Sequence, residues 1–303
     1  MSAEGNVALD STAAPLPPAT ASRFQNSTMP RALVGLGALL LVTTAQADLY
    51  PLWEAGAGGA VVNLLDYRGS DEQKTYVLPI PYVVYRGERL KIDREKVRGL
   101  LFSHDLAELD VSLNGTVPVK SSDNRARAGM PDLDATLEIG PSLNVALYRG
   151  PTKRRVLELR LPLRAVIATD LSSTRHVGWL FHPHINLDLK DVIPGPGWNF
   201  GMLAGPIFGN ERYHDYFYGV APAFATTARP AYDASGGYSG AQFITSVSKR
   251  FQNYWLGAFI RVDSVDGARF EDSPLVRRKS GVSGGVAVAW VFARSSKLVE
   301  SLD

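Results

Sequence analysis

The chain has 303 residues, of which 45% are hydrophobic and 20% are charged, a composition typical of a folded protein and too polar for a bundle of membrane helices. The formal net charge of +2, without a basic run, gives no indication of nucleic-acid binding. The chain contains no cysteine, which excludes disulfides and thiolate metal sites.

An apolar run near the N-terminus, residues 32–45, is too short to span a bilayer as a helix, which takes about 20 residues. Arg31 precedes the run, and Ala45-Gln46-Ala47 closes it with the small-x-small pattern of a signal-peptidase site. We therefore interpret residues 29–47 as a signal peptide and expect the protein to be exported.

The segment before this signal, residues 1–28, is polar, proline-rich and without periodicity. It is either a disordered extension or the product of a mis-assigned start, in which case translation begins at Met29. The remainder, residues 48–303, has no linker-like break, and we expect it to form one domain.

Most of that domain alternates apolar and other side chains with the period of two that is typical of strands. The alternating runs, in chain order, are 53–62, 77–85, 107–114, 133–147, 154–167, 176–189, 198–208, 241–247, 254–262 and 282–292, with the weakest contrast in the first two. In residues 154–167 the odd positions are apolar, whereas the even positions include Glu158, Arg160 and Arg164.

Several of these runs are about 15 residues long, well above the usual strand length of roughly 5–6. A strand that crosses a bilayer at a tilt needs that length, with an apolar face toward lipid and a polar face toward the lumen. Closure into a barrel also leaves no backbone group unpaired in hydrocarbon. The sequence therefore predicts an all-β fold, a transmembrane antiparallel β-barrel, rather than a soluble barrel with its apolar face inward.

The ten runs and the unclear segment 89–102 together give the strand count. Because both termini of a bacterial barrel lie in the periplasm, the number of strands is even. Splitting the segment into two short strands, 89–94 and 97–103, gives about twelve strands, with ten as the alternative. The long connections 63–76, 115–132, 210–237 and 266–278 then all fall on the outer side.

The polar face predicts a cluster of side chains in the lumen. Its candidate members are Glu138, Glu158, Arg160, Arg164, His182, His184 and Asp188, with Arg250, Arg261 and Asp263 on later strands. Mixed charge signs favour a paired, plugged interior over the single-sign ring of a selective pore. Imidazole and carboxylate ligands suit zinc or nickel, but with His182, His184 and Asp188 on a single strand we expect lumen lining and no metal site.

A barrel lipase or deacylase needs a Ser/His pair that lipid can reach, with a carboxylate or amide that orients the histidine. The predicted lipid face carries no histidine, and the two residues are adjacent only at Ser103-His104. We therefore expect no enzymatic activity and no cofactor.

The connection 213–238 is rich in aromatic residues. Exposed aromatic side chains on a loop suit protein recognition, which makes Tyr213, Tyr216, Phe217 and Tyr218 a candidate external recognition loop. In the alternative interpretation these side chains fold into the barrel mouth or join the aromatic girdle at the membrane surface.

Several stretches resemble one family of membrane proteins. They are Tyr67-Arg68-Gly69-Ser70-Asp71, Leu78-Pro79-Ile80-Pro81-Tyr82, Tyr85-Arg86-Gly87, Tyr213 to Val220, Arg229-Pro230-Ala231-Tyr232-Asp233-Ala234, Gly236-Gly237-Tyr238 and Asp272-Ser273-Pro274-Leu275-Val276. In order and spacing, these stretches are similar to the MipA/OmpV family of outer-membrane proteins. One departure is the end of the chain, which continues past the expected terminal aromatic, Phe292, to Asp303.

The resemblance implies a β-barrel in the outer membrane of a Gram-negative bacterium. It also implies a non-enzymatic scaffold for murein-remodelling enzymes, with a lytic transglycosylase and a bifunctional murein synthase as partners besides the outer-membrane lipids. Other family members are described as immunogenic surface proteins or adhesins, so the alternative function is a passive channel or a surface adhesin.

Overall fold

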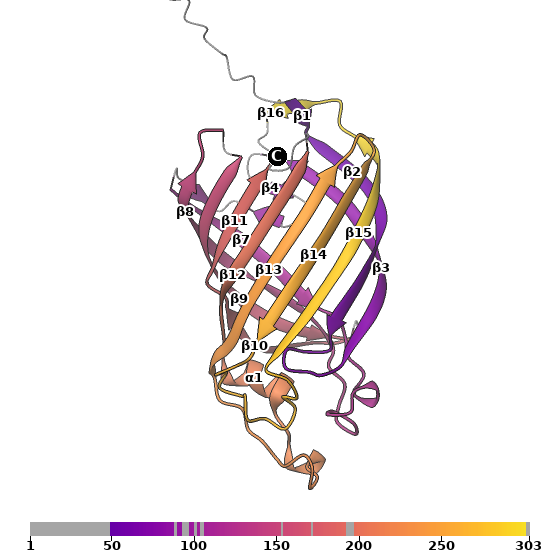
Figure 1. Ribbon diagram of the computed structural model, residues 1–303, viewed down its shortest axis with the longest axis vertical. Helices are drawn as coiled ribbons and strands as arrows, with labels where there is room; N and C mark the ends of the chain where they lie inside the picture. Colours follow the sequence, from indigo (N-terminus) through magenta and orange to yellow (C-terminus); the bar gives the residue numbers. More distant parts are fainter. Residues whose placement is uncertain are drawn as a thin grey trace, which may run out of the picture. The chain divides into compact units, whose positions relative to one another are not determined.

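Long antiparallel strands make up most of the structure, a computed structural model (Figure 1). The structure describes residues 49–87, 90–92, 97–99, 102–103, 106–152, 154–170, 172–191 and 197–300. The expected signal peptide, residues 29–47, and the preceding residues 1–28 lie outside the described residues, as does His104.

Among the residues that the structure describes, eleven long or intermediate strands form the wall. They are β2 (Trp53–Leu65), β3 (Gln73–Arg86), β7 (Ala107–Thr116), β8 (Ala135–Arg149), β9 (Arg155–Thr169), β10 (Thr174–Phe181), β11 (His184–Lys190), β12 (Trp198–Gly209), β13 (Gly237–Arg250), β14 (Tyr254–Ser264) and β15 (Ser280–Arg294). Shorter elements are β1 (Leu49–Pro51), β4 (Leu90–Ile92), β5 (Val97–Gly99), β6 (Phe102–Ser103), β16 (Leu298–Glu300), the helix α1 (Glu211–Tyr218) and two 3₁₀ turns, η1 (Ser121–Asp123) and η2 (Pro222–Phe224).

The strands pair in an order that runs around a barrel. The order is β5-β4-β3-β2-β15-β14-β13-β12-β10-β9-β8-β7-β6, and β11 continues the position of β10 between β9 and β12. The last long strand, β15, pairs with the first, β2, and β5 lies beside β7, which brings the two ends of the order together. The all-β antiparallel barrel is confirmed. Because β10 and β11 share one place in the barrel, the eleven longer strands occupy ten places around it. β4 and β5–β6 lie where the sequence predicts two further short strands.

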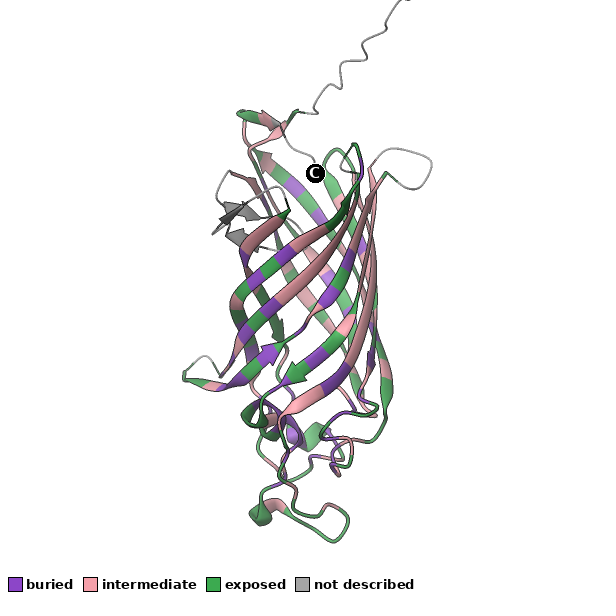
Figure 2. Ribbon diagram, turned by 90° about the vertical axis from the view of Figure 1, so that its left-hand side faces the viewer, coloured by how far each residue is buried: buried purple, intermediate pink, exposed green. Residues whose placement is uncertain are grey.

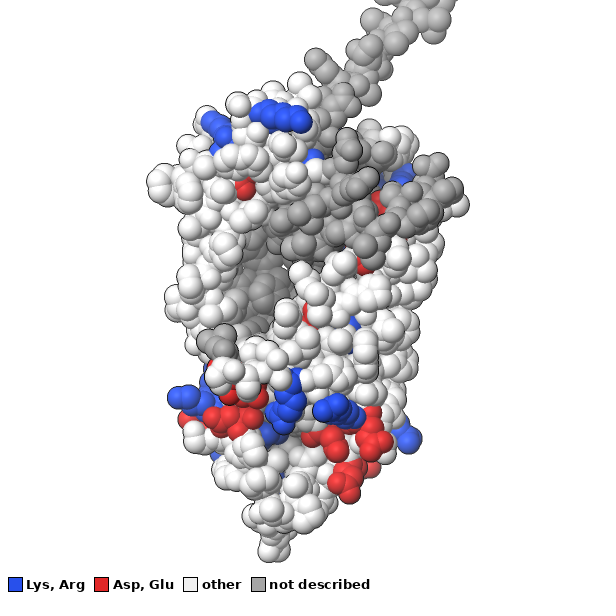
Figure 3. Space-filling view, turned by 180° about the vertical axis from the view of Figure 1, so that it is seen from behind, with Lys and Arg blue, Asp and Glu red and all other residues white. Residues whose placement is uncertain are grey.

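The two faces of the wall differ as the alternation predicts (Figure 2). Large apolar side chains project outward, for example Val77 on β3, Leu163 on β9 and Ile260 on β14. Buried polar side chains alternate with them on the inner face, including Glu138 and Arg164. On the side of the molecule that Figure 3 shows, the charged side chains among the coloured residues gather mainly near the two ends of the barrel.

The membrane-crossing elements of this chain are strands. Among the residues that the structure describes, no helix is both long enough and apolar enough to cross a membrane. The helix α1 has eight residues, and it lies in the connection between β12 and β13.

The four long connections, residues 66–72, 117–134, 210–236 and 265–279, gather at one end of the barrel, which we call the long-loop end; it carries α1 (Figure 1). The turns that follow β8, β11 and β13 lie at the opposite end, the short-turn end, together with β1 and β16.

Two residues leave the faces that strict alternation predicts. The register between β9 and β10 shifts between His176 and Gly178, and this bulge turns Val177 into the protein core instead of toward lipid. Leu133 precedes β8, pairs with Val119 and is also buried in that core. Local irregularity therefore overrides the period of two at both positions.

After β15, the described part of the chain forms a small second sheet at the short-turn end. β16 pairs antiparallel with β1, with Tyr50 opposite Val299. The Leu52 amide donates to the Lys297 carbonyl over 2.8 Å, and the Ser295 amide donates to the Trp53 carbonyl over 2.9 Å. The tail therefore fastens the two ends of the barrel chain to each other.

Candidate functional site: a capped lumen

The largest buried apolar cluster of the described residues lies at the long-loop end rather than along the wall. We call it the cap. Its core consists of Tyr67, Val119, Leu133, Val166, Ala168, Val177, Leu180, Ile207, Tyr213, Phe217, Tyr218, Val220, Ala234, Val265, Ala268, Phe270 and Leu275. All four long connections contribute to it, so the loops fold together over the barrel mouth.

Aromatic rings form the centre of the cap. Tyr218 stacks on Phe270 with ring centroids 3.5 Å apart and an angle of 8° between the rings. Tyr67 meets Tyr218 edge-on at 6.2 Å, and His214 meets Phe270 edge-on at 4.7 Å. Such contacts stabilise aromatic pairs by about 0.5–1.5 kcal/mol beyond the area that they bury.

The buried tyrosine hydroxyls tie one loop to another. The Tyr67 hydroxyl donates to the Leu275 carbonyl over 2.8 Å, and the Tyr218 hydroxyl donates to the Arg68 carbonyl over 2.9 Å. Burial raises the pKa of both phenols far above the usual value, so both remain protonated donors at any physiological pH.

Arginines join the loops through backbone carbonyls. Arg68 donates to the Ser239 carbonyl over 2.8 Å. Arg127 donates to the Phe217 carbonyl over 3.1 Å, and Arg229 donates to the Ala126 and Ala128 carbonyls at 3.0 and 2.9 Å. Each contact joins segments that are far apart in the sequence, so the cap is fixed by polar as well as apolar contacts.

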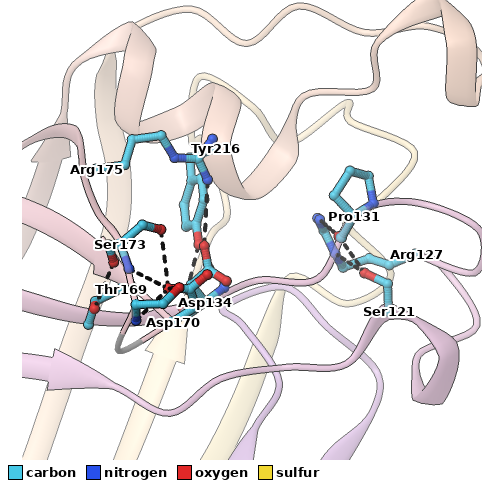
Figure 4. A network of polar contacts seen from close by, with 10 residues as sticks. Ser121, Arg127, Pro131, Asp134, Thr169, Asp170, Ser173, Arg175 and Tyr216 are labelled. Atoms are coloured by element: carbon cyan, nitrogen blue, oxygen red, sulfur yellow. Dashed lines mark hydrogen bonds and ion pairs between the residues drawn. The ribbon is translucent and has the colours of Figure 1, made fainter.

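Figure 4 shows how the outer loops are held. Arg127 also bonds to the Ser121 hydroxyl and to the Pro131 carbonyl, which closes the 117–134 loop on itself. On the other side of the view, the Tyr216 hydroxyl accepts from the Asp134 amide over 2.9 Å, and the Arg175 guanidinium lies 5.4 Å from the Tyr216 ring centre.

The cap corrects one expectation about the aromatic loop. Tyr213, Phe217 and Tyr218 are buried, and Tyr216 is half-buried against the cap core, so these four rings do not form an exposed recognition surface. The reason is that α1 turns three of the rings into the barrel mouth, where burial of aromatic area stabilises the closed loops. This is the alternative in which the aromatics fold into the mouth.

The helix α1 was not predicted, although the sequence carries two signals for it. Tyr213, His214, Phe217 and Tyr218 have the spacing of one helical face. Asn210 is the N-cap, and its side chain accepts from the Tyr213 amide over 3.1 Å. The strong period of two on either side obscured this short element.

Below the cap, charged side chains on the inner face are paired. The predicted cluster occurs on adjacent strands: Arg164 lies 3.0 Å from Glu138, and Arg160 lies 2.8 Å from Glu158 and 3.2 Å from Asp188. Arg261 lies 2.9 Å from Asp263. Opposite charges are therefore neutralised within the lumen, as burial of ions requires.

A second ionic cluster lies toward the short-turn end. Arg250 lies 3.0 Å and Arg86 lies 3.5 Å from the buried Glu54 carboxylate, to which the Tyr82 hydroxyl also donates over 3.3 Å. The alternation of the sequence predicts Arg250 in the lumen but does not indicate Glu54 or Arg86 as its neighbours.

The two central histidines are buried side by side where β10 ends and β11 begins. The rings of His182 and His184 are 4.7 Å apart, and His184 Nδ1 lies 2.7 Å from the His182 carbonyl oxygen. Pro183 between them has no amide hydrogen to donate, and the paired strand is interrupted there. Within the described part of the chain, no group of three or more His, Cys, Asp or Glu side chains is placed to hold a metal ion.

The structure also brings together a Ser/His pair that the sequence did not indicate. His214 Nε2 lies 2.5 Å from the Ser239 hydroxyl, and His214 Nδ1 lies 2.5 Å from the Ser235 carbonyl. Burial lowers the His214 pKa, which favours the neutral ring. Both side chains are fully buried, and the group that orients the ring is a carbonyl rather than a carboxylate, so the pair serves the cap.

A cavity of about 330 Å³ lies under the cap. Strands from around the barrel contribute to it, including β8 through Glu138, β9 through Arg164 and β14 through Arg261. The cap closes it with Tyr213, Phe217 and Tyr218. The lumen therefore contains a polar chamber that is covered at the long-loop end.

Comparison with known proteins gives the family. The family described as MltA-interacting protein MipA matches residues 55–292, which include every strand from β3 to β14. The chain belongs to the MipA family.

Two relatives of this MipA-family chain are outer-membrane proteins of Vibrio. Outer membrane protein OmpV of Vibrio cholerae serotype O1 and outer membrane protein Omp26La of Vibrio anguillarum are each 25% identical over 245 residues, which cover 79% of this chain and 85% of the relative. With the family match, they place this barrel in the outer membrane.

Among solved structures, the chain is similar to an outer membrane channel from Pseudomonas putida F1, with a TM-score of 0.45, 12% identity and coverage of 83% of this chain and 100% of that one. It is also similar to outer membrane phospholipase A from Escherichia coli, with a TM-score of 0.32, 11% identity and coverage of 82% and 93%.

Four of the stretches that resemble the MipA/OmpV family meet in the cap, although they are scattered along the sequence, whereas Leu78 to Tyr82 and Tyr85 to Arg86 lie on β3. Tyr67 and Arg68, the segment Tyr213 to Val220, Arg229, and Ser273 with Leu275 all make cap contacts. The Ser273 hydroxyl, for example, donates to the Tyr218 carbonyl over 2.7 Å. In this MipA-family chain, those four stretches therefore build the closed long-loop end.

Proposed function

We propose that this outer-membrane barrel is a non-enzymatic scaffold that gathers murein-remodelling enzymes, a lytic transglycosylase and a murein synthase, at its short-turn end. The observation that carries the proposal is the match to a family described as MltA-interacting. The short-turn end faces the periplasm, where murein lies, if the long loops face outward as in other bacterial barrels.

The cap supports a scaffold over the alternative of a passive channel. A pore needs a continuous aqueous path, whereas the rings of Tyr218 and Phe270 are stacked and buried across the long-loop end. The paired charges below them provide no ring of a single sign that would select an ion.

The buried Ser/His pair supports a non-enzymatic role. Nucleophilic catalysis needs a serine that substrate can reach and a base oriented by a third group. Ser239 and His214 are each 0% exposed, and the polar partners of the histidine are the Ser235 carbonyl and Ser239 itself.

Site-specific cross-linking tests the proposal. Because the chain has no cysteine, a single introduced cysteine can carry a photo-activated cross-linker. Gln252→Cys places it on an exposed turn at the short-turn end, and Ser122→Cys places it on an exposed residue of the long-loop end as the matched control. Cross-linking is carried out in intact envelopes, and the products are identified by mass spectrometry.

The scaffold predicts a lytic transglycosylase or a murein synthase on the cysteine at position 252 and neither enzyme on the cysteine at position 122. Cross-links to neither enzyme, together with discrete conductance steps in a planar bilayer, would instead establish the channel. Cross-links to host surface proteins from position 122 alone would establish the adhesin.

A further inference from the structure

The lumen has two unlike walls. Strands β7 to β11 present polar and paired side chains along the lumen. On β14, β15, β2 and β3 the ion pairs lie toward the two ends, at Arg261–Asp263 and at Glu54–Arg86, and the inner face between them is an apolar wall. This apolar wall includes Val62, Leu78, Ile80, Tyr82, Val84 and Phe259, which alternate with the lipid-facing residues of the same strands. A water-filled pore or a fully ion-paired plug does not require such a surface.

The apolar wall begins at the edge of the chamber under the cap. Phe259 precedes the chamber residue Arg261 by two positions on β14, so the two side chains share the inner face. Gly285 lies opposite both Phe259 and Val62 in the paired strands. A methyl group on Gly285 would come within 2.6 Å of Val62 and 3.1 Å of Phe259, so these side chains form a continuous surface across three strands.

The chamber holds polar atoms that are buried without a partner. Arg68 Nη2, His182 Nε2 and Asp66 Oδ1 have no hydrogen-bond partner, and all three residues line the chamber. Asp66 is 8% exposed and His182 is 5% exposed. Burial of a polar group without a hydrogen-bond partner is unfavourable, so a polar ligand that supplies the missing partner would be stabilised there.

The unpartnered atoms have opposite character, which restricts the chemistry of the ligand. The Arg68 guanidinium is a cationic hydrogen-bond donor and suits an anionic group. Asp66 Oδ1 is a carboxylate oxygen that accepts hydrogen bonds, so it suits a cationic or N–H group. The fixed charges around the chamber are balanced, because Arg164 and Arg261 are already paired with Glu138 and Asp263. A simple anion would leave the Asp66 carboxylate facing a like charge.

We propose that the capped lumen binds an amphipathic zwitterion, with its anionic group at Arg68, its cationic group at Asp66 and its apolar chain along the wall of Val62 and Phe259. A phospholipid-type head group and the backbone ends of a free apolar amino acid share this chemistry. The chamber volume of about 330 Å³ lies in the range of small-molecule pockets and accommodates either head.

Four probes separate the parts of the proposal. Lysophosphatidylethanolamine carries the zwitterion and a chain, dodecyl phosphate carries a chain and no ammonium, O-phosphoethanolamine carries the zwitterion and no chain, and leucine represents the amino-acid source. Binding of each radiolabelled probe is measured by equilibrium dialysis against the full-length barrel in an amphipathic polymer, which avoids competition by zwitterionic lipid.

The expected result is saturable binding of one lysophosphatidylethanolamine per chain, at least tenfold tighter than dodecyl phosphate or O-phosphoethanolamine. If leucine binds tightest of the four, the source is an amino acid, and the zwitterion site still stands. Equal binding of lysophosphatidylethanolamine and dodecyl phosphate, or no saturable binding of any probe, overturns the proposal.

Variants with matched controls locate the site. Asp66→Asn is expected to reduce the preference for lysophosphatidylethanolamine over dodecyl phosphate from tenfold toward one, a change of ligand preference that misfolding would not produce. Arg68→Gln is expected to weaken the binding of lysophosphatidylethanolamine and of dodecyl phosphate about tenfold. Arg125→Gln, which changes an exposed loop arginine, should leave the affinity for both probes unchanged.

Phe259→Ala is expected to weaken the binding of the two probes that carry an apolar chain. Ile260→Ala, a change of the adjacent lipid-facing residue, should leave the binding of both unchanged. Heat-modifiable gel mobility verifies that each variant has folded. Equal effects of Phe259→Ala and Ile260→Ala would place the chain outside the lumen and overturn the assignment.

Discussion

Tyr218 and Phe270 stack face to face with ring centroids 3.5 Å apart, and this contact joins the connection after β12 to the connection after β14. Both rings are buried at the mouth of the barrel. Among the described residues, the largest buried apolar cluster of this membrane protein therefore lies at its closed end, whereas the apolar outer face of the wall meets lipid.

Removal of one ring is expected to open the cap. Phe270→Ala deletes the stacked partner of Tyr218 and leaves a cavity, a change that costs about 3–5 kcal/mol in a packed core. The loops should then separate while the strands stay paired. We expect increased protease cleavage within residues 210–236 and 265–279 and more frequent conductance steps in a planar bilayer than for the unmodified protein.

The matched control for this prediction is Phe292→Ala. That ring is 58% exposed on the lipid face, so its removal should leave loop cleavage and conductance unchanged. An equal increase in conductance in both variants would show that the increase comes from general destabilisation of the barrel and not from opening of the cap.

The buried pair in the lumen should contribute more to stability than a pair at the rim. Glu138→Ala leaves the buried Arg164 guanidinium without its counter-ion, and breaking such a pair costs about 3–5 kcal/mol. Lys74→Ala removes the exposed partner of Asp123, a pair of a kind that contributes about 0–1 kcal/mol. The measurement is the urea midpoint of folding into lipid vesicles, and equal midpoints for the two variants would contradict a larger contribution of the buried Glu138–Arg164 pair.

Much of the wall was predictable because each strand is long and its two faces meet different solvents. Leu163 and Arg164, for example, are adjacent in sequence and lie on opposite faces of β9 as expected. The bulge that buries Val177 was not predictable, because a one-residue insertion in the pairing depends on the register of the neighbouring strand.

The cap was not predictable in its detail. Its contacts join loops that are far apart in the sequence, such as Arg127 with Phe217, and nothing local to either residue specifies the other. The aromatic residues of the 213–238 connection were evident, but whether they face outward or inward depends on α1 and on the rings that the other loops supply.

The turn after β9 gives a prediction about pH. The backbone amide of Ser173 donates to the Asp170 carboxylate, as do the hydroxyl and amide of Ser172 and the Ser173 hydroxyl, and these bonds lower the Asp170 pKa from 3.8 to about 2 (Figure 4). The folded pKa lies below the unfolded value, so the stabilisation is fully present above about pH 4 and is lost as pH falls toward 2. In a carboxyl titration followed by NMR, the double variant Ser172→Ala/Ser173→Ala should raise the midpoint, and an unchanged midpoint would show that the hydroxyls do not bond to Asp170.

The pairing of β1 with β16 predicts that the tail protects the N-terminal segment of the barrel domain. Val299→Pro places a residue without an amide hydrogen opposite Tyr50 and should disrupt this two-stranded sheet. β2 and β15 pair with each other independently of the tail, so heat-modifiable folding should be retained while cleavage near residues 49–52 increases. Val299→Thr keeps the amide and the β-branched shape, and its cleavage should match that of the unmodified protein. A sheet of two three-residue strands contributes little to the equilibrium stability of the barrel. If Val299→Pro abolished folding, the tail would therefore be required for barrel assembly itself and not only for fastening the chain ends.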